Sequence, residues 1–180
     1  RRSRATGGGS LLDLAVHHID FARFALAAEV KSVTARIESK ESDHDFATLT
    51  LTMSDGTAVE IKVEFGGAFR ERIEVHGEKA TLWFDRAHSV DVGRSAPGRK
   101  IGAWSAIRAS FPTPGRVAYW ALRRRSPFHE PSYAIALSTF VDAAIHGTRP
   151  APDLMDGLAA LAVIDAAERS SASGQPVSVA

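Results

Sequence analysis

Three polar residues near the N-terminus have a spacing that suits proton transfer. Asp13, His17 and Asp20 lie at positions i, i+4 and i+7 of a segment whose apolar residues recur at helical spacing, so their side chains would share one helical face. Histidine titrates near neutral pH, and a neighbouring carboxylate orients its ring and favours its protonated form, which suits a base that accepts a proton from an alcohol. Solvated polar pairs and helix caps also use this spacing, so the spacing alone leaves the role open.

A metal-dependent hydrolase is a further interpretation of the same residues, because ligands four positions apart on a helix suit a divalent ion. No second cluster of ligands at a characteristic spacing accompanies Asp13, His17 and Asp20 in the sequence. The sequence therefore favours the acid–base interpretation over the metal site.

Three helices are predicted to flank a set of strands. Helical spacing of apolar residues covers residues 11–27, with Ser10 placed to cap the first turn, and returns over residues 131–146 and 153–173. Asp153 and Asp156 have the positions of acids in the first turn of the last helix.

Period-two alternation between these helices predicts about five strands in one meander. Their inward residues are Val33, Ala35 and Ile37, then Ala47, Leu49, Leu51 and Met53, then Val59, Ile61, Val63 and Phe65, then Ile73 and Val75, and then the strand over residues 80–84. A turn at residues 54–57 makes the second and third strands an antiparallel hairpin. Residues 85–129 have a weaker pattern, for which we expect one or two further strands.

The predicted fold class is α+β, a largely antiparallel open sheet with helices packed on one face. The 180 residues suit one domain with one core. The other face of the sheet would be polar and covered by water or by a partner sheet. Its side chains would be Thr34, Arg36, Glu38, Thr48, Thr50, Thr52, Glu60, Lys62 and Glu64.

Composition excludes several classes of partner. A formal charge of +1 provides no general attraction for nucleic acid or an acidic membrane, and the arginines at residues 123–125 are expected to be a solvated loop. No apolar run is long enough to span a bilayer. The absence of cysteine fits a reducing compartment, so we expect a cytoplasmic location.

No dinucleotide-binding motif is present in the sequence. A strand followed by G-x-G-x-x-G and a helix would indicate one, and the triple glycine at residues 7–9 does not supply it. The chain also begins at Arg1 without methionine and runs almost directly into a helix. We therefore expect a fragment whose dinucleotide-binding half lies outside this chain.

The segment GGGSLLDLAVHHID (residues 7–20) closely resembles the motif that opens the C-terminal domain of the glucose-fructose oxidoreductase, inositol dehydrogenase and rhizopine-catabolism (Gfo/Idh/MocA) family. RIEVHGEKATL (residues 72–82) is similar to a late strand pair of that family, and DGL (156–158) with AAERS (166–170) resembles its last helix. The resemblance covers most of the chain outside residues 87–130. Ala15 stands where the family commonly has glycine.

This resemblance implies an NAD(P)-dependent dehydrogenase that acts on a sugar, a polyol or a related cyclic alcohol. The residue that matches Asp13 binds a substrate hydroxyl in the family, and the one that matches His17 accepts the proton while a hydride goes to NAD or NADP. The cofactor and a lysine from an E-K-P motif belong to a Rossmann half that this chain lacks. Pairing of open sheets in the family implies a homodimer or tetramer.

Two alternatives stay open beside this interpretation. The same fold could serve as a non-catalytic oligomerisation or sensory module, and a related branch of the family uses NAD for glycoside cleavage. Among single residues, Tyr133 at the start of the second helix is a candidate to reach a sugar hydroxyl, although such tyrosines are often simply half-buried. His18 faces about 100° away from His17 and is expected to be structural.

Overall fold

The computed structural model describes residues 3, 8–41, 43–66, 71–85, 92–97, 102–104, 107, 114, 117–118, 121, 125 and 132–179. The chain divides into two compact units, of which the first comprises Arg1–Gly66 and Arg149–Ala180 and the second Gly67–Thr148. Within the described residues, no helix is both long enough and apolar enough to cross a membrane.

The first unit contains a four-stranded antiparallel sheet. Its strands are β1 (Val30–Glu38), β2 (Phe46–Met53), β3 (Ala58–Glu64) and the short β7 (Val177–Ser178), in the order β3-β2-β1-β7. Apolar residues alternate with threonines along β2, so every second side chain is buried. This alternation fixes the register in which Leu49 lies opposite Ile61.

The predicted hairpin between β2 and β3 is confirmed. The turn at its tip is held by the Asp55 carboxylate, which accepts hydrogen bonds from the Thr57 backbone N–H at 2.9 Å and from the Thr57 hydroxyl at 3.0 Å. Such a local bond from an aspartate side chain to the backbone two residues on is a common turn device. The sequence signal was therefore sufficient for this element.

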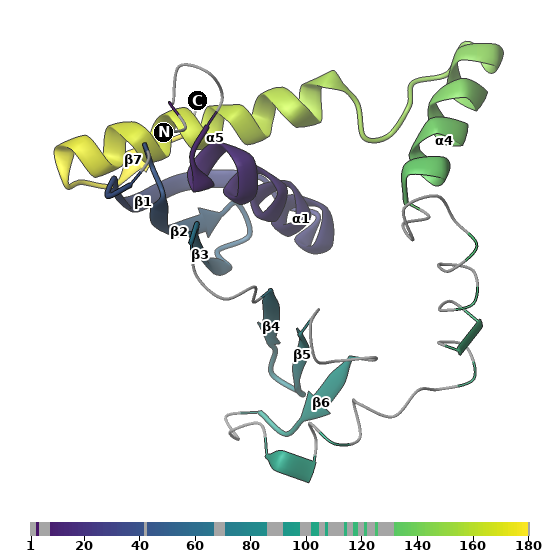
Figure 1. The fold of residues 1–180 in the computed structure, drawn as a ribbon, viewed down its shortest axis with the longest axis horizontal. Coiled ribbons are helices and arrows are strands. Elements are labelled where there is room, and N and C mark those ends of the chain that lie inside the picture. The colour runs from purple at the N-terminus through teal and green to yellow at the C-terminus, as the bar shows by residue number, and fades with distance from the viewer. Residues whose placement is uncertain are drawn as a thin grey trace. The chain divides into compact units, whose positions relative to one another are not determined.

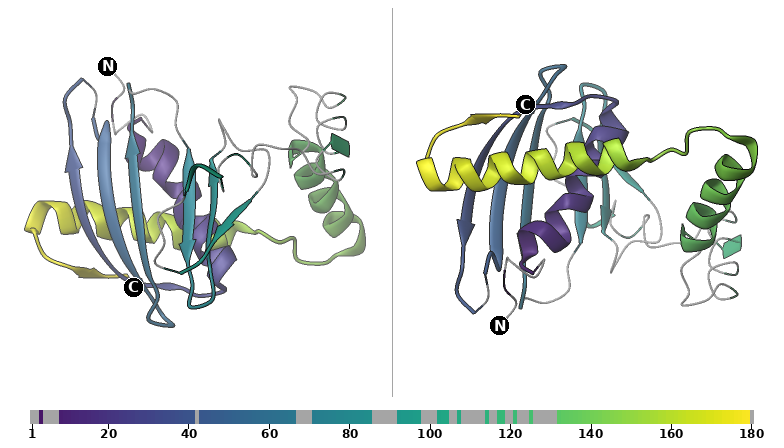
Figure 2. Two further views of the ribbon diagram at one scale, coloured as in Figure 1. Left: turned by 90° about the horizontal axis from the view of Figure 1, so that it is seen from below. Right: turned by 90° about the horizontal axis from the view of Figure 1, so that it is seen from above.

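Helices cover one face of this sheet, as predicted. A π-helical turn, η2 (Leu11–Ala15), leads into α1 (Val16–Leu26), and α5 (Leu154–Ser173) crosses the strands on the same side (Figures 1 and 2). The core lies between the helices and the sheet and contains Leu11, Ala15, Ile19, Val33, Ala47, Leu49, Leu51, Met53, Ile61, Val63, Ala160, Val163, Ile164, Ala166 and Ala167, among others.

Two serines of α5 satisfy backbone N–H groups of β1. The Ser170 hydroxyl accepts from Ala35 N and the Ser171 hydroxyl accepts from Ile37 N, both at 3.0 Å. Because β7 pairs with β1 only at Ser32 and Val33, these two N–H groups lie beyond the ladder and would otherwise lack a strand partner. The helix thus completes the edge of the sheet.

Among the described residues, the second unit contains a three-stranded antiparallel sheet and the helix α4. The strands are β4 (Arg72–His76), β5 (Thr81–Asp85) and β6 (Gly93–Ser95), in the order β4-β5-β6, and the helix is α4 (Ser132–His146). Trp83 is buried, whereas almost every described side chain of α4 is exposed.

The α+β fold class is confirmed, but the single five-stranded meander is wrong. The five predicted strands form, yet β4 and β5 belong to a different sheet from β1, β2 and β3. Alternation of apolar and polar residues identifies strands but does not show which strands pair. The sequence pattern therefore could not predict that the strands divide into two sheets. β6 is one of the extra strands expected after residue 85, and most of that segment, with Arg123 and Arg124, lies outside the described residues.

Asp156 lies in the first turn of α5 as predicted, whereas Asp153, predicted there too, is the N-cap. The Asp153 carboxylate accepts hydrogen bonds from Met155 N and Asp156 N while the Asp156 carboxylate accepts one from Asp153 N, which is a capping box. Ser10, predicted to cap the first helix, makes no capping bond. Its hydroxyl donates instead to the carbonyl of His44, at 2.8 Å, because a tertiary partner lies within reach.

Candidate active site

Asp13 and His17 lie on the exposed stripe of the first helix. Leu11, Ala15 and Ile19 form the opposite, fully buried stripe, so the helix is oriented by its apolar side chains and presents the polar pair to solvent. The predicted helix over residues 11–27 is confirmed: it ends at Leu26, and its first turn is π-helical. A π-turn closes with i→i+5 bonds and is therefore wider, and single π-turns occur frequently at functional sites.

The start of this helix is held by the loop before β2. The carbonyl oxygen of His44 accepts two hydrogen bonds from Ser10, one from its backbone N–H at 2.7 Å and one from its hydroxyl. Gly9 has φ +98°, and a Cβ there would lie 2.5 Å from the carbonyl oxygen of Asp43. The His44 Nδ1 lies 3.5 Å from Glu168 Oε1 of α5. The loop at Asp43 and His44 therefore fixes the turn that carries Asp13, and His44 itself lies beside α5.

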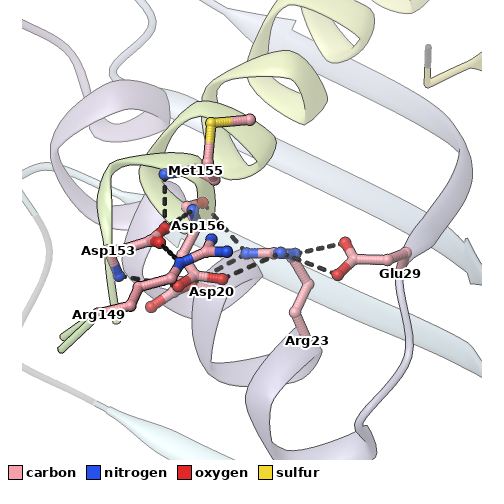
Figure 3. Close-up of polar contacts among 7 residues, drawn as sticks. All are labelled: Asp20, Arg23, Glu29, Arg149, Asp153, Met155 and Asp156. Atoms are coloured by element: carbon pink, nitrogen blue, oxygen red, sulfur yellow. Dashed lines mark hydrogen bonds and ion pairs between the residues drawn. The ribbon is translucent and has the colours of Figure 1, made fainter. Parts of the chain in front are cut away.

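Asp20, the third of the three polar residues that share the predicted helical face, belongs to a cluster of charged residues around Arg23 (Figure 3). Arg23 has 9% of its surface exposed. It donates to both carboxylate oxygens of Glu29 at 2.7 and 2.9 Å, to Asp20 Oδ1 at 3.2 Å and to the Asp156 backbone oxygen at 3.1 Å. The guanidinium also lies 3.5 Å from the Asp156 carboxylate, so one cation joins α1 to the start of α5.

The electrostatics of this cluster follow from its hydrogen bonds. The bond to Glu29 raises the pKa of Arg23 above its ordinary value despite partial burial, and attraction to Glu29, Asp156 and Asp20 adds to this. The same bond lowers the pKa of Glu29. Arg23 therefore stays charged and holds the helices together over the whole physiological pH range. The role of Arg23 in joining the two helices could not be predicted from the sequence, because its partner Asp156 is 133 positions away.

This arrangement can bind a hydroxyl compound and exchange a proton with it. A carboxylate and an imidazole that are exposed on one helical stripe can accept hydrogen bonds from an alcohol, and a histidine can take its proton. Among the residues that the structure describes, no group of three or more His, Asp and Glu side chains could hold a metal ion. A shallow hollow in the second unit, lined by Val75, Lys79, Leu82 and Arg94 among others, contains neither Asp13 nor His17.

None of the other residues singled out in the sequence belongs to this helical stripe. His18 is half-buried, beside the exposed His17. Tyr133 lies in the first turn of α4 in the second unit and is exposed, so its role stays a prediction. Asp153 forms an ion pair with Arg149, and the pKa of Asp153 is lowered chiefly by that hydrogen bond.

Residues 1–83 match the family model described as the GFO/IDH/MocA C-terminal domain. The chain is 29% identical to an inositol 2-dehydrogenase of Rhizobium meliloti (strain 1021) over 96% of its own length and 50% of that relative. The chain spans about half the length of the curated relatives it matches, and the family match falls on a domain that is named as C-terminal.

Solved structures share the fold of this chain. An oxidoreductase domain protein from Kribbella flavida has a TM-score of 0.72 at 22% identity, and the match covers 97% of this chain and 51% of that one. A levoglucosan dehydrogenase in complex with NADH and levoglucosan has a TM-score of 0.72 at 18% identity, with 97% and 51% covered.

Proposed function

We propose that this chain is the substrate-binding and catalytic half of an NAD(P)-dependent dehydrogenase that oxidises a sugar, a polyol or a related cyclic alcohol. The observation that carries the proposal is the exposed pair Asp13 and His17 on a helix whose start is held by hydrogen bonds from Ser10 to the carbonyl of His44. The relative from Rhizobium meliloti is named as an inositol 2-dehydrogenase, which supports a cyclic polyol as the substrate class.

In this proposal His17 accepts the proton of the substrate hydroxyl, while Asp13 binds that substrate and orients the imidazole. The carbon-bound hydrogen leaves as a hydride to the nicotinamide, so alcohol and NAD(P)⁺ become ketone and NAD(P)H. NAD or NADP would be held by a Rossmann half that this sequence does not contain, because the sequence has no G-x-G-x-x-G turn. Tyr133 is a further candidate contact to the substrate.

Replacement of His17 tests this assignment in the full-length enzyme. His17→Ala should lower turnover by about 10²- to 10⁴-fold, the usual worth of a positioned acid or base, with little change in cofactor affinity. Asp13→Asn should raise the KM for the alcohol. Steady-state kinetics of myo-inositol oxidation, monitored as NADH absorbance, provide both values.

His18→Ala is the matched control, because it removes an imidazole from the same helix at a half-buried position. Its turnover should stay within a few-fold of the wild type. Near-normal turnover and an unchanged pH profile in His17→Ala would assign the base to another residue. Titration calorimetry of the 180-residue chain with NAD and NADP should detect no micromolar binding, and detection of such binding would contradict the proposed Rossmann half.

We also propose that two copies pair through the outer face of the first sheet, and that the protein works in the cytoplasm. Thr50 lies opposite Glu60 and Thr48 opposite Lys62, and both Glu60 and Lys62 are exposed. A flat polar surface of this kind lets a two-fold axis match each Glu with a Lys of the other copy. Analytical ultracentrifugation should find dimers or larger species, and a monomer at high concentration would contradict the pairing.

A further inference from the structure

We infer that His44 is a positioning residue for the proposed active site. Its imidazole lies against Glu168 of α5, and its backbone carbonyl holds the turn that carries Asp13. The inference rests on the proposed function, because that function gives Asp13 and His17 their roles. His44 itself is assigned no contact with the substrate or the cofactor, and it acts through the turn alone.

The carbonyl oxygen of His44 is the anchor of this turn. It accepts both hydrogen bonds of Ser10, from the backbone N–H at 2.7 Å and from the hydroxyl at 2.8 Å. Ser10 is fully buried, and the preceding Gly9 accepts at its carbonyl oxygen from Asp13 N at 3.0 Å. Because hydrogen bonds weaken steeply when their geometry changes, a displaced His44 carbonyl would either release Ser10 or move the turn with it.

The backbone of His44 needs support from its surroundings. Its φ is +51°, in the left-handed region that is unfavourable for residues with a Cβ, although histidine and asparagine are enriched there. Its N–H donates to the Ser39 hydroxyl at 3.0 Å. Further along the same loop, the buried carboxylate of Asp45 accepts from Glu41 N at 2.7 Å. Such a conformation persists only where the surrounding contacts hold it.

The imidazole of His44 supplies a further contact, to α5. Its Nδ1 is buried and has no hydrogen-bond partner within the part of the chain that the structure describes, and it lies 3.5 Å from Glu168 Oε1. A ring nitrogen that carries hydrogen needs an acceptor, and a carboxylate oxygen is one. A shift of about 0.5 Å would bring the two atoms into the usual range of about 2.7–3.2 Å. The loop is therefore tied to α5 through this pair.

Glu168 lies on a part of α5 that is fixed to the sheet. Ala167 is fully buried, and the hydroxyls of Ser170 and Ser171 accept from backbone N–H groups of β1, both at 3.0 Å. These contacts lie on both sides of Glu168 in the helix. The contact with Glu168 therefore refers the position of His44 to the rigid part of the first unit.

Precision at the turn matters for the proposed chemistry. A proton acceptor and a hydroxyl-binding carboxylate must meet the substrate at hydrogen-bond distance, and a displacement of about 1 Å can lower a rate by about 10²-fold. Asp13 lies within the turn, and His17 lies in the helix that continues it. Loss of the contact between His44 and Glu168 should therefore impair catalysis although no group that touches the substrate is removed.

Replacement of His44 in the full-length enzyme tests this role. His44→Ala should raise the KM for myo-inositol and lower kcat, each by at least about fivefold, while the Kd for NAD stays unchanged. A mere loss of folded enzyme would lower kcat and leave KM as it was. Glu168→Ala should act in the same direction. The double variant should be no worse than the more impaired single variant, because both changes remove one contact.

His44→Asn is the conservative variant that should restore function. Asparagine is also enriched in the left-handed region, and its amide nitrogen is bonded to Cγ, as Nδ1 is in histidine, so it can donate to Glu168. Its KM and kcat should stay within a few-fold of the wild type. His76→Ala is the matched control, because His76 Nε2 lies 3.3 Å from Glu74 Oε2 in a pair whose histidine is largely exposed. This variant should keep wild-type kinetics.

Hydrogen exchange measures the turn itself, independently of activity. In the same enzyme, the Ser10 amide should exchange at least about tenfold faster in His44→Ala than in the wild type, and should recover in His44→Asn. The Ser54 amide is the internal reference, because it also donates in a 2.7 Å bond, to Glu29 O, beyond the other end of β2. Its exchange rate should not change.

Three results would overturn the inference. An unchanged Ser10 exchange rate in His44→Ala would show that the imidazole does not hold the turn. Faster exchange with wild-type kcat and KM would show that the turn does not position the site. Additive losses in the double variant would separate His44 from Glu168. Normal turnover in His17→Ala would contradict the proposed function, whereas loss of turnover there with wild-type kinetics in His44→Ala would contradict this inference alone.

Discussion

The two ends of α5 have similar residues and opposite surroundings. Near its middle and C-terminal end, Val163, Ile164 and Ala167 are buried against the sheet, whereas Leu154 and Leu158 at its start are exposed. Figure 2 shows the sheet beneath only part of the helix. Apolar residues along one helix thus serve as core where a sheet covers them, and stay exposed where none does. The same contrast between covered and uncovered positions gives four predictions.

The largest expected difference concerns two apolar truncations on this helix. Ile164→Ala should destabilise the 180-residue chain by about 2–5 kcal/mol, because it removes buried methyl groups and leaves a cavity. Leu154→Ala should change the free energy of unfolding by less than about 0.5 kcal/mol. Urea denaturation followed by circular dichroism measures both. A comparable loss in the two variants would mean that Leu154 is covered in solution.

The comparison of a buried position with an exposed one can also be made for two arginines, Arg23 and Arg149. Arg23→Gln should lower the free energy of unfolding by about 1.5–3 kcal/mol, because it removes charge-assisted bonds to Glu29 and Asp20 from a buried guanidinium. Arg149 also has a carboxylate partner, Asp153, but is largely exposed, so Arg149→Gln should have no measurable effect. Equal melting temperatures for both variants would remove Arg23 as the link between α1 and α5.

A comparison of Gly9 with Gly56 distinguishes the cost of backbone strain from the cost of steric crowding by an added Cβ. Gly9 and Gly56 both have positive φ, +98° and +87°, so an alanine at either position should cost about 1–2 kcal/mol for the backbone alone. A Cβ at Gly9 would also lie 2.5 Å from the Asp43 carbonyl oxygen, while nothing lies within 4 Å at Gly56. Gly9→Ala should therefore be more destabilising by at least about 1 kcal/mol, and chemical denaturation of the two variants compares them directly.

The smallest expected effect depends on pH. The bond to Arg23 lowers the pKa of Glu29 in the folded chain, so the stability that this pair adds is present above the unfolded pKa of about 4.3 and is lost as the pH falls through the folded pKa. Glu29 is itself two-thirds exposed, so the contribution should be below about 1 kcal/mol. Glu29→Gln should reduce the loss of stability between about pH 5 and pH 3. An acid unfolding curve parallel to that of the wild type would contradict this.

Local signals predicted the elements of this chain well. The turn at Asp55 and Thr57 and the cap at Asp153 were predictable because each uses bonds within a few residues. Ser10 has the same capping chemistry but bonds to His44, 34 positions away, and a single sequence gives no indication of that partner. The division into two sheets, and the pairing of two-residue β7 with β1, likewise depend on contacts between distant segments.

For the candidate site, the sequence by itself determined that a carboxylate, Asp13, and an imidazole, His17, share one helical face, because helical periodicity relates residues four apart without reference to anything else. It also determined that the dinucleotide motif is missing. Tertiary structure alone decided that Arg23 bonds to Asp156, that His44 and Gly9 fix the start of the helix, and that Leu154 stays uncovered. Each of these features depends on which parts of the folded chain are in contact. Such contacts determine burial and hydrogen bonding, and they can join residues that are far apart in the sequence.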